Sequence, residues 1–204
     1  MTATSEGLSI ESRVVVVFDI CSSSRVLEDL MLTGNLAALR DVLISMKNFL
    51  REESEAANFE VYKFIGDGWI LLFPFNVGGK RLIQSLEELS RFFKDQASTR
   101  IHPKLQTTPE VMGLTFGIDS GELVRVVMLR NREYLGRPLN IACRLQTAIK
   151  DKDPKPQYKA LFSKHTFRRL GLPSEFRRVV AVERTLRNIQ GGDRYECVKL
   201  NLVV

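Results

Sequence analysis

The stretch RVVVVFD, residues 13–19, decides the fold class of this 204-residue chain. Its β-branched run is typical of a strand that is buried on both faces of a sheet. The run ends at Asp19, and a carboxylate in that position is costly to desolvate unless it has a partner. The sequence therefore predicts a central strand whose last side chain either caps the next helix or takes part in function.

Patterns typical of helices and strands continue outward from this run. Leucine and methionine side chains at spacings of three and four predict an amphipathic helix over residues 36–50, with Asn35 as its cap. Two predicted strands at 59–63 and 69–73 flank Gly66-Asp67-Gly68, a sequence typical of a tight hairpin turn. The other predicted elements are, in chain order, a helix over 81–93, a loop over 97–109, a hairpin of strands 111–118 and 122–129 that turns at Ser120-Gly121, a helix over 139–149, a loop over 151–158, a short helix over 163–170 and strands at 178–182 and 194–200.

This order of elements predicts an α+β fold in which helices cover one side of a mainly antiparallel sheet. Residues 1–12 are polar and are expected to be a flexible N-terminus, and residues 13–204 are expected to form one domain. No apolar run reaches the roughly 20 residues that a membrane-spanning helix needs, and the N-terminus lacks the apolar stretch of a signal peptide. A cytoplasmic protein without a membrane span is therefore expected.

The composition narrows the class of partner. The net charge is +6, and much of the basic excess follows Arg100, which fits an anionic partner such as a polyphosphate or a nucleic acid, or else a solvated basic surface. Three scattered cysteines form no CxxC pair, so neither a disulfide framework nor a zinc site is indicated.

Two pairs of polar residues are candidates for chemistry. Asp67 lies at the predicted turn, and if the first hairpin lies beside the first strand, Asp19 and Asp67 converge where they can hold hard cations against a triphosphate. The serines that follow Asp19 can present hydroxyl and N–H groups to an anion. Asn140 and Arg144 are four residues apart on a predicted helix and therefore share a face, although a helix cap and a solvated charge explain each residue alone.

Four motifs, in order, resemble those of class III adenylate and guanylate cyclases. They are VVVFDICSSS (residues 15–24), KFIGD (63–67), FGIDSGE (116–122) and LGRPLNIACRL (135–145). The resemblance covers the chain from about residue 13 to 198 and implies a ferredoxin-like class III cyclase fold. It also implies an enzyme that turns a nucleoside triphosphate into a 3′,5′-cyclic nucleotide and pyrophosphate.

The resemblance implies a role for each candidate residue. Asp19 and Asp67, assisted by the Ile20 carbonyl, would bind two Mg²⁺ or Mn²⁺ ions. The backbone after Ile20 would hold the β- and γ-phosphates. The residues of this segment are Cys21, Ser22, Ser23 and Ser24.

The remaining family positions concern the ribose, the α-phosphate and the base. Asn140 would orient the ribose, and Arg144 would neutralise charge on the α-phosphate. Lys63 and Glu133 fall at the base-reading positions, and Arg187 roughly matches a triphosphate-binding lysine. In the family the two sites form between protomers, so a chain that carries all these positions implies a homodimer.

One segment and two single residues depart from the family pattern. Ser22-Ser23-Ser24 replaces Gly-Phe-Thr, Asp119 replaces a histidine, and Glu133 replaces the Asp of adenylate cyclases or the Cys of guanylate cyclases. Together with YKFIGDGW (residues 62–69) and the lack of an attached sensor domain, these departures look similar to the stand-alone pyrimidine cyclases of bacterial Pycsar anti-phage systems. Those enzymes make cyclic UMP or cyclic CMP for a separate effector.

The residues do not decide which base the substrate nucleotide carries. Bulky Tyr62 or Trp69 would shrink a purine pocket, but Tyr62 neighbours Lys63 and is expected on the opposite face of the strand. Lys63 is also the residue that adenylate cyclases carry. An ordinary adenylate cyclase is therefore the first rival, and a non-catalytic nucleotide-binding module is the second. An RNA-binding domain is not expected because no RNP-like aromatic strand motif is present.

Overall fold

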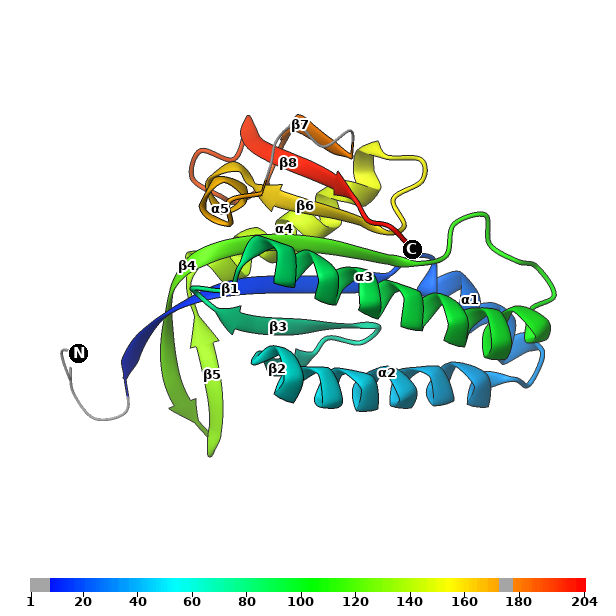
Figure 1. Cartoon of the computed structure of the whole chain (residues 1–204). Helices are drawn as coiled ribbons and strands as arrows, with labels where there is room; N and C mark the ends of the chain where they lie inside the picture. The colour runs from blue at the N-terminus through cyan, green and yellow to red at the C-terminus, as the bar shows by residue number, and fades with distance from the viewer. Residues whose placement is uncertain (1–7, 173–177) are drawn as a thin grey trace.

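The computed structural model describes residues 8–172 and 178–204 (Figure 1). The strands are β1 (Ser9–Ile20), β2 (Glu60–Phe64), β3 (Gly68–Pro74), β4 (Leu114–Met128), β5 (Asn131–Leu135), β6 (Lys159–Ser163), β7 (Val179–Arg184) and β8 (Tyr195–Asn201). The helices are α1 (Ser23–Leu32), α2 (Leu36–Ala57), α3 (Gly79–Gln96), α4 (Arg137–Lys152) and α5 (Lys164–Arg169). No helix in the described ranges has the length and apolar character to cross a bilayer.

The strands form one eight-stranded sheet in the order β2-β3-β1-β4-β6-β8-β7, and β5 pairs with β4 outside this path. Neighbouring strands are antiparallel except β4 and β6, which are parallel. The predicted fold class, an α+β domain built on a mainly antiparallel sheet with helices packed on it, is therefore confirmed.

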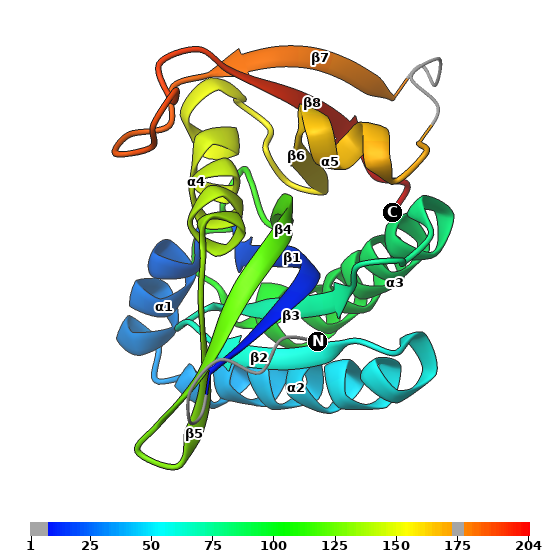
Figure 2. The same cartoon turned by 90° about the vertical axis from the view of Figure 1, so that its left-hand side faces the viewer.

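Helices cover both faces of the sheet, whereas the sequence predicts helices on one side. Val14, Val16 and Phe18 of β1 pack in the core that α1, α2 and α3 complete, and Val15 and Val17 pack with Ala142 of α4. Figure 2 shows α3 and α4 on opposite sides of the central strands. The physical reason is the valine run itself, because a strand that is apolar on both faces needs cover on both.

The predicted hairpin at Ser120-Gly121 is wrong, because β4 continues through these residues. Gly121 pairs with Arg13, so β1 supplies an unbroken partner and the chain has no reason to turn. The turn comes instead at Leu129 and Arg130, which have φ angles of 49° and 68°. Such positive angles usually select Asn or Gly, so Leu and Arg give no sequence signal for this turn.

Other boundaries also differ from the predictions. β1 begins at Ser9, which pairs with Arg125, so only residues 1–7 of the expected flexible N-terminus lie outside the described residues. The predicted loop over 97–109 begins as a π-helical turn (Ala97–Ile101) that continues α3 and a 3₁₀ turn (His102–Lys104). β6 was not predicted, because it has only five residues and its partners are distant in sequence. Asn35 precedes α2 without a side-chain cap bond.

Candidate active site

Asp19 and Asp67 lie at the same end of the sheet. Asp19 pairs across the strands with Gly68, the neighbour of Asp67 in the β2–β3 turn, and the Ile65 N–H closes this turn on the Gly68 carbonyl at 3.0 Å. A Cβ atom on Gly68 would lie 1.9 Å from the Phe18 carbonyl oxygen. The turn therefore packs directly against the end of β1, so Asp67 and Asp19 lie at neighbouring positions of the same sheet end.

Polar side chains from two helices contact these carboxylates. The Ser23 hydroxyl, in the first turn of α1, donates a hydrogen bond to Asp67. Gln146 of α4 donates from Nε2 to Asp19 Oδ2 at 3.3 Å and to Thr115 Oγ1 at 2.9 Å. Sequence reasoning missed Gln146. A signal was present in the sequence. Gln146 follows Ala142 by four residues and so lies on the same buried face of the helix, where an apolar side chain is expected.

The donor set at this end of the sheet fits hard divalent cations. Asp19 and Asp67 would supply carboxylate oxygens to such a cation, and Ile20, the last residue of β1, would supply a backbone carbonyl. Residues 8–172 and 178–204 contain no group of three or more His, Cys, Asp or Glu side chains that could hold a metal ion. Mg²⁺ is usually held by one or two carboxylates and by substrate phosphates, so two carboxylates are sufficient.

The serine segment lies where β1 passes into α1. Ser22 has φ 60° and ψ 19°, and it precedes α1 without a side-chain cap bond. The first N–H groups of a helix have no partner within the helix, and they favour anions. The N–H of Cys21, however, donates to the Gly113 carbonyl at 2.8 Å, and its side chain is buried. Cys21 is therefore not available to a phosphate through its N–H, while Ser22, Ser23 and Ser24 remain candidates.

Tyr62 and Lys63 both reach Glu133, which corrects the expectation that they point to opposite faces of β2. Tyr62 donates from its hydroxyl to Glu133 Oε2 at 2.5 Å, and Lys63 Nζ lies 3.0 and 3.2 Å from the two carboxylate oxygens. The pairing of β2 with β3 shifts between Val61 and Lys63. This β-bulge breaks the regular alternation of side chains, because it adds one residue to one strand.

The hydrogen bonds of this cluster fix the protonation of two groups. Hydrogen bonds from Tyr62 and Lys63 lower the pKa of Glu133, so its carboxylate stays charged. Burial, and then the hydrogen bond to Glu133, raises the pKa of Tyr62, so the phenol remains a donor. The Tyr134 N–H donates to the Tyr62 hydroxyl at 3.0 Å and holds it in place. Glu133 is therefore a charged carboxylate that Tyr62 and Lys63 hold in a fixed orientation.

Trp69 does not belong to this cluster. Its ring is buried, and it stacks on Phe18 with centroids 5.5 Å apart, in the core beneath α1 and α2. Tyr62 packs in the other core, with Tyr134 and α4. Trp69 also lines the apolar groove that Tyr62 and Lys63 line, so its effect on a base pocket stays a prediction.

Asn140 and Arg144 share one face of α4, as predicted from their spacing. Together with Asn188, Cys143, Thr147 and Ile189 they line a pocket of about 300 Å³. α4 begins after Gly136, so Asn140 is not its cap. Arg187 is exposed in the segment between β7 and β8, next to the pocket residue Asn188. Neither Asp19 nor Asp67 lines this pocket.

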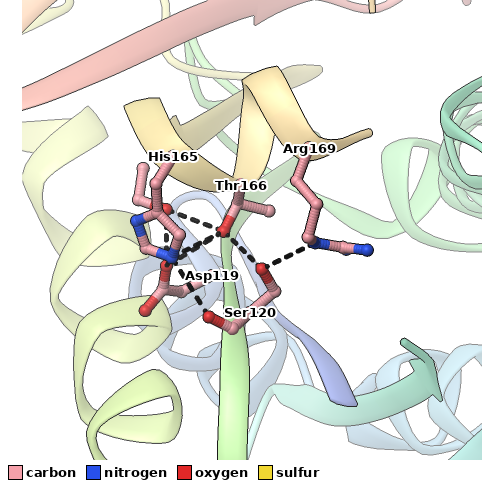
Figure 3. Close-up of polar contacts among 6 residues, drawn as sticks. Asp119, Ser120, His165, Thr166 and Arg169 are labelled. Atoms are coloured by element: carbon pink, nitrogen blue, oxygen red, sulfur yellow. Dashed lines mark hydrogen bonds and ion pairs between the residues drawn. The ribbon is translucent and has the colours of Figure 1, made fainter. Parts of the chain in front are cut away.

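Asp119, at the position where the resemblance expects a histidine, belongs to a buried network with Ser120, His165, Thr166 and Arg169 (Figure 3). Only 2% of Asp119 is exposed, and it accepts hydrogen bonds from Ser163 at 2.5 Å and Thr166 at 3.1 Å. His165 Nε2 lies 3.1 Å from the same carboxylate. Burial raises the pKa of Asp119, and these partners oppose the effect. The network joins β4 to the end of β6 and to α5, which is a structural role.

Neither a protein-family model nor a curated protein sequence matches the chain. Solved structures match it over nearly its whole length. The guanylyl cyclase Cya2 is 15% identical, with 97% of this chain and 95% of that chain covered and a TM-score of 0.73. The adenylyl cyclase CyaB from P. aeruginosa is 15% identical, with 97% of both chains covered and a TM-score of 0.72.

A third similar structure is the adenylate/guanylate cyclase/hydrolase from Silicibacter pomeroyi. It is 15% identical, with 96% of this chain and 99% of that chain covered and a TM-score of 0.63. The chain therefore has the fold of class III adenylyl and guanylyl cyclase catalytic domains.

Proposed function

We propose that the protein is a class III nucleotidyl cyclase, which converts a nucleoside triphosphate to a 3′,5′-cyclic nucleotide and pyrophosphate. The observation that carries the proposal is the convergence of Asp19 and Asp67 beside the first turn of α1. Two carboxylates for hard cations and a helix start for phosphates form a binding site for a metal–triphosphate complex. A non-catalytic module would not need both carboxylates, and their retention favours an enzyme.

In the proposed reaction, different residues of this chain bind the phosphates, orient the ribose and stabilise the developing charge. The first turn of α1 holds the β- and γ-phosphates, and Ser23 keeps Asp67 beside them. Asn140 orients the ribose so that its 3′-hydroxyl faces the α-phosphorus, and Arg144 neutralises the charge that develops there. Divalent cations, when bound by Asp19 and Asp67, lower the pKa of the attacking hydroxyl and stabilise the triphosphate charge.

The proposed active enzyme is a homodimer with two equivalent shared sites. Asn140 and Arg144 line a pocket that contains neither carboxylate, which supports a site completed by a second copy. The chain also exposes apolar surface that a second copy would cover. Val127, Met128 and Leu129 are exposed at the tip of the β4–β5 hairpin, and an apolar groove of about 640 Å³ lies between α1, α2 and β2.

Mixing two inactive variants tests this assembly. Asp67→Ala and Arg144→Ala homodimers are each expected to be inactive, while their heterodimer has one intact site and one site with both changes. Partial recovery of activity on mixing is expected once subunits exchange, as verified by mass analysis of differently tagged chains. Verified heterodimers without activity would contradict the shared site.

We further propose that the preferred base is a pyrimidine, so that the substrate is UTP or CTP. Tyr62 supports this, because its hydroxyl contacts Glu133 and its ring lies beside Lys63, where it would leave less room for a purine. Glu133 offers an acceptor and Lys63 a donor, a pair that suits the polar edge of uracil or cytosine. In this proposal the cyclic nucleotide acts on a separate effector protein.

Competition among the four nucleoside triphosphates tests both levels of the proposal. The protein is incubated with equal concentrations of all four and Mn²⁺, and the products are identified by mass spectrometry. Cyclic UMP or cyclic CMP is expected to dominate. Cyclic AMP as the main product would remove the pyrimidine proposal and leave an adenylate cyclase. No cyclic nucleotide from a folded protein would remove the cyclase proposal itself.

A further inference from the structure

Gln146 is the polar side chain that links the Asp19 carboxylate to α4. It is only 7% exposed. An amide nitrogen has two N–H donors, and here one points to Asp19 Oδ2 at 3.3 Å and the other to Thr115 Oγ1 at 2.9 Å. Thr115 is itself fully buried and lies opposite Asp19 in the β1–β4 pairing. The Gln146 amide is therefore held in place by two hydrogen bonds, one to Asp19 and one to Thr115.

The fold makes room for this contact at Gly117. A Cβ atom there would lie 2.1 Å from the Ala142 carbonyl oxygen and 2.3 Å from the Gln146 backbone nitrogen. Helix α4 therefore rests directly on the backbone of β4, which lets the Gln146 side chain reach Asp19. A buried polar group is costly unless it is hydrogen-bonded, so the protein keeps an amide there at the expense of an apolar contact.

The chemistry of an amide suits a carboxylate that must bind a cation. A lysine or arginine at position 146 would compete with the cation for Asp19, and a second carboxylate would repel Asp19. An amide donor orients the carboxylate and leaves its negative charge intact. Groups that hydrogen-bond a metal-binding carboxylate fix its direction and tune its affinity for the metal.

We propose that Gln146 is a positioning residue that holds the Asp19 carboxylate in the orientation required for binding the metal–triphosphate complex, an inference that rests on the proposed cyclase function. The hydrogen bond acts before any chemistry, so it affects metal binding more than the rate of the bound complex.

The first test measures binding without turnover. The affinity for the Mn²⁺ complex of inorganic triphosphate is determined by calorimetry for the wild type, Gln146→Met and Asp19→Asn. Gln146→Met is expected to weaken binding roughly 10-fold, because losing such an outer partner typically costs 10- to 100-fold in metal affinity. Thr166→Val, which removes a buried hydroxyl from the Asp119 network, is the matched control and should bind like the wild type.

The outcomes separate this proposal from the proposed function. Wild-type affinity in folded Gln146→Met, alongside weak binding by Asp19→Asn, would overturn the positioning role alone. Wild-type affinity in Asp19→Asn would overturn the metal assignment, and the Gln146 proposal with it. Equal weakening by Gln146→Met and Thr166→Val would also overturn it, because it would show a general effect of disturbing the core.

The second test uses heterodimers, in which a loss of stability and a positioning role give different results. In a heterodimer of Asp67→Ala and Arg144→Ala chains, the Arg144→Ala chain supplies Asp19 to the one intact site. Gln146→Met in that chain is expected to raise the Mn²⁺ concentration for half-maximal activity roughly 10-fold. The same change in the Asp67→Ala chain should leave that concentration unchanged. Equal effects from the two placements would overturn the proposal.

Discussion

Glu133 and Asp119 are carboxylates with similar partners, and their pKa values move in opposite directions. Glu133 accepts hydrogen bonds from a tyrosine hydroxyl and a lysine, and they lower its pKa. Asp119 accepts hydrogen bonds from two hydroxyl groups and contacts a histidine, yet burial raises its pKa. The difference follows from burial, which raises the pKa of Asp119 by more than its partners lower it, whereas the partners of Glu133 outweigh the weaker effect of burial there.

The two environments also differ in what they connect. The Glu133 cluster joins an edge strand to the β4–β5 hairpin and leaves Lys63 half exposed, where a ligand can reach it. The Asp119 network joins the inner strand β4 to α5, and its labelled members include none of the predicted site residues (Figure 3). Changes at the first region should alter binding and catalysis, and changes at the second should alter stability.

The largest loss of activity is expected when Asp19 or Asp67, the carboxylates next to α1, is replaced. Asp19→Ala or Asp67→Ala should lower kcat/KM by about 1000-fold or more, because each removes an electrostatic partner of the reacting phosphates. The melting temperature should change little. Initial rates with Mn²⁺ and the preferred triphosphate measure the effect, and Asp41→Ala, a change to an exposed carboxylate of α2, is the control. Substantial activity in either folded variant would exclude the two-metal assignment.

A change in the buried Asp119 network should have the opposite result, a loss of stability with little loss of activity. Thr166→Val keeps the shape of the side chain but removes the hydrogen bonds that the Thr166 hydroxyl makes with Asp119, Ser120 and Ser163. Ser163 still donates to Asp119, and Arg169 still donates to Ser120. We expect the free energy of unfolding to fall by about 2 kcal/mol, since several buried hydrogen bonds are lost and each contributes roughly 0.5–1.5 kcal/mol. Urea denaturation measures the change. A loss of kcat without a loss of stability would contradict the structural role of the network.

Asp153 sharpens the comparison, because it is buried like Asp119 but has a low pKa. Burial alone raises its pKa, but hydrogen bonds from Lys159 and Lys199 outweigh burial and bring the pKa from 3.8 to about 2. The stability that depends on the charged form is therefore complete above pH 3.8 and is lost as the pH falls towards 2. Between pH 5 and pH 3 the wild type should lose about 1 kcal/mol more than Asp153→Asn in urea denaturation. Parallel pH profiles would contradict this prediction.

The smallest effect is expected from the Tyr62 hydroxyl. Tyr62→Phe removes one of the donors that hold Glu133, so KM for the preferred triphosphate should rise about threefold with little change in kcat. Tyr134→Phe removes a hydroxyl that contacts Glu60 instead, and it is the matched control. Steady-state kinetics on all four triphosphates distinguish the two variants. An equal rise of KM in both would show that Tyr62 has no specific role at Glu133.

Local sequence patterns predicted the features that depend on few residues. Gly66-Asp67-Gly68 gave the turn, the valine run gave the central strand, and together they placed Asp67 beside Asp19. The features that were missed depend on partners distant in sequence. The β2 bulge has no signal in a strand of ordinary composition, and the Gln146 contact exists only because α4 rests on Gly117. The fold class was therefore more predictable than the contacts that orient its site.

The bulge in β2 has a consequence for how base selectivity can change during evolution. Because β2 is the edge of the sheet, the extra residue disturbs pairing with one neighbour only, and Glu60 and Val61 keep their partners Leu72 and Leu71. A single-codon insertion or deletion here switches which side chain stands beside Lys63 while the rest of the sheet stays in register. Under the proposed base-reading role of Lys63 and Glu133, the length of β2 as well as the identity of its residues would affect which nucleotide the protein prefers.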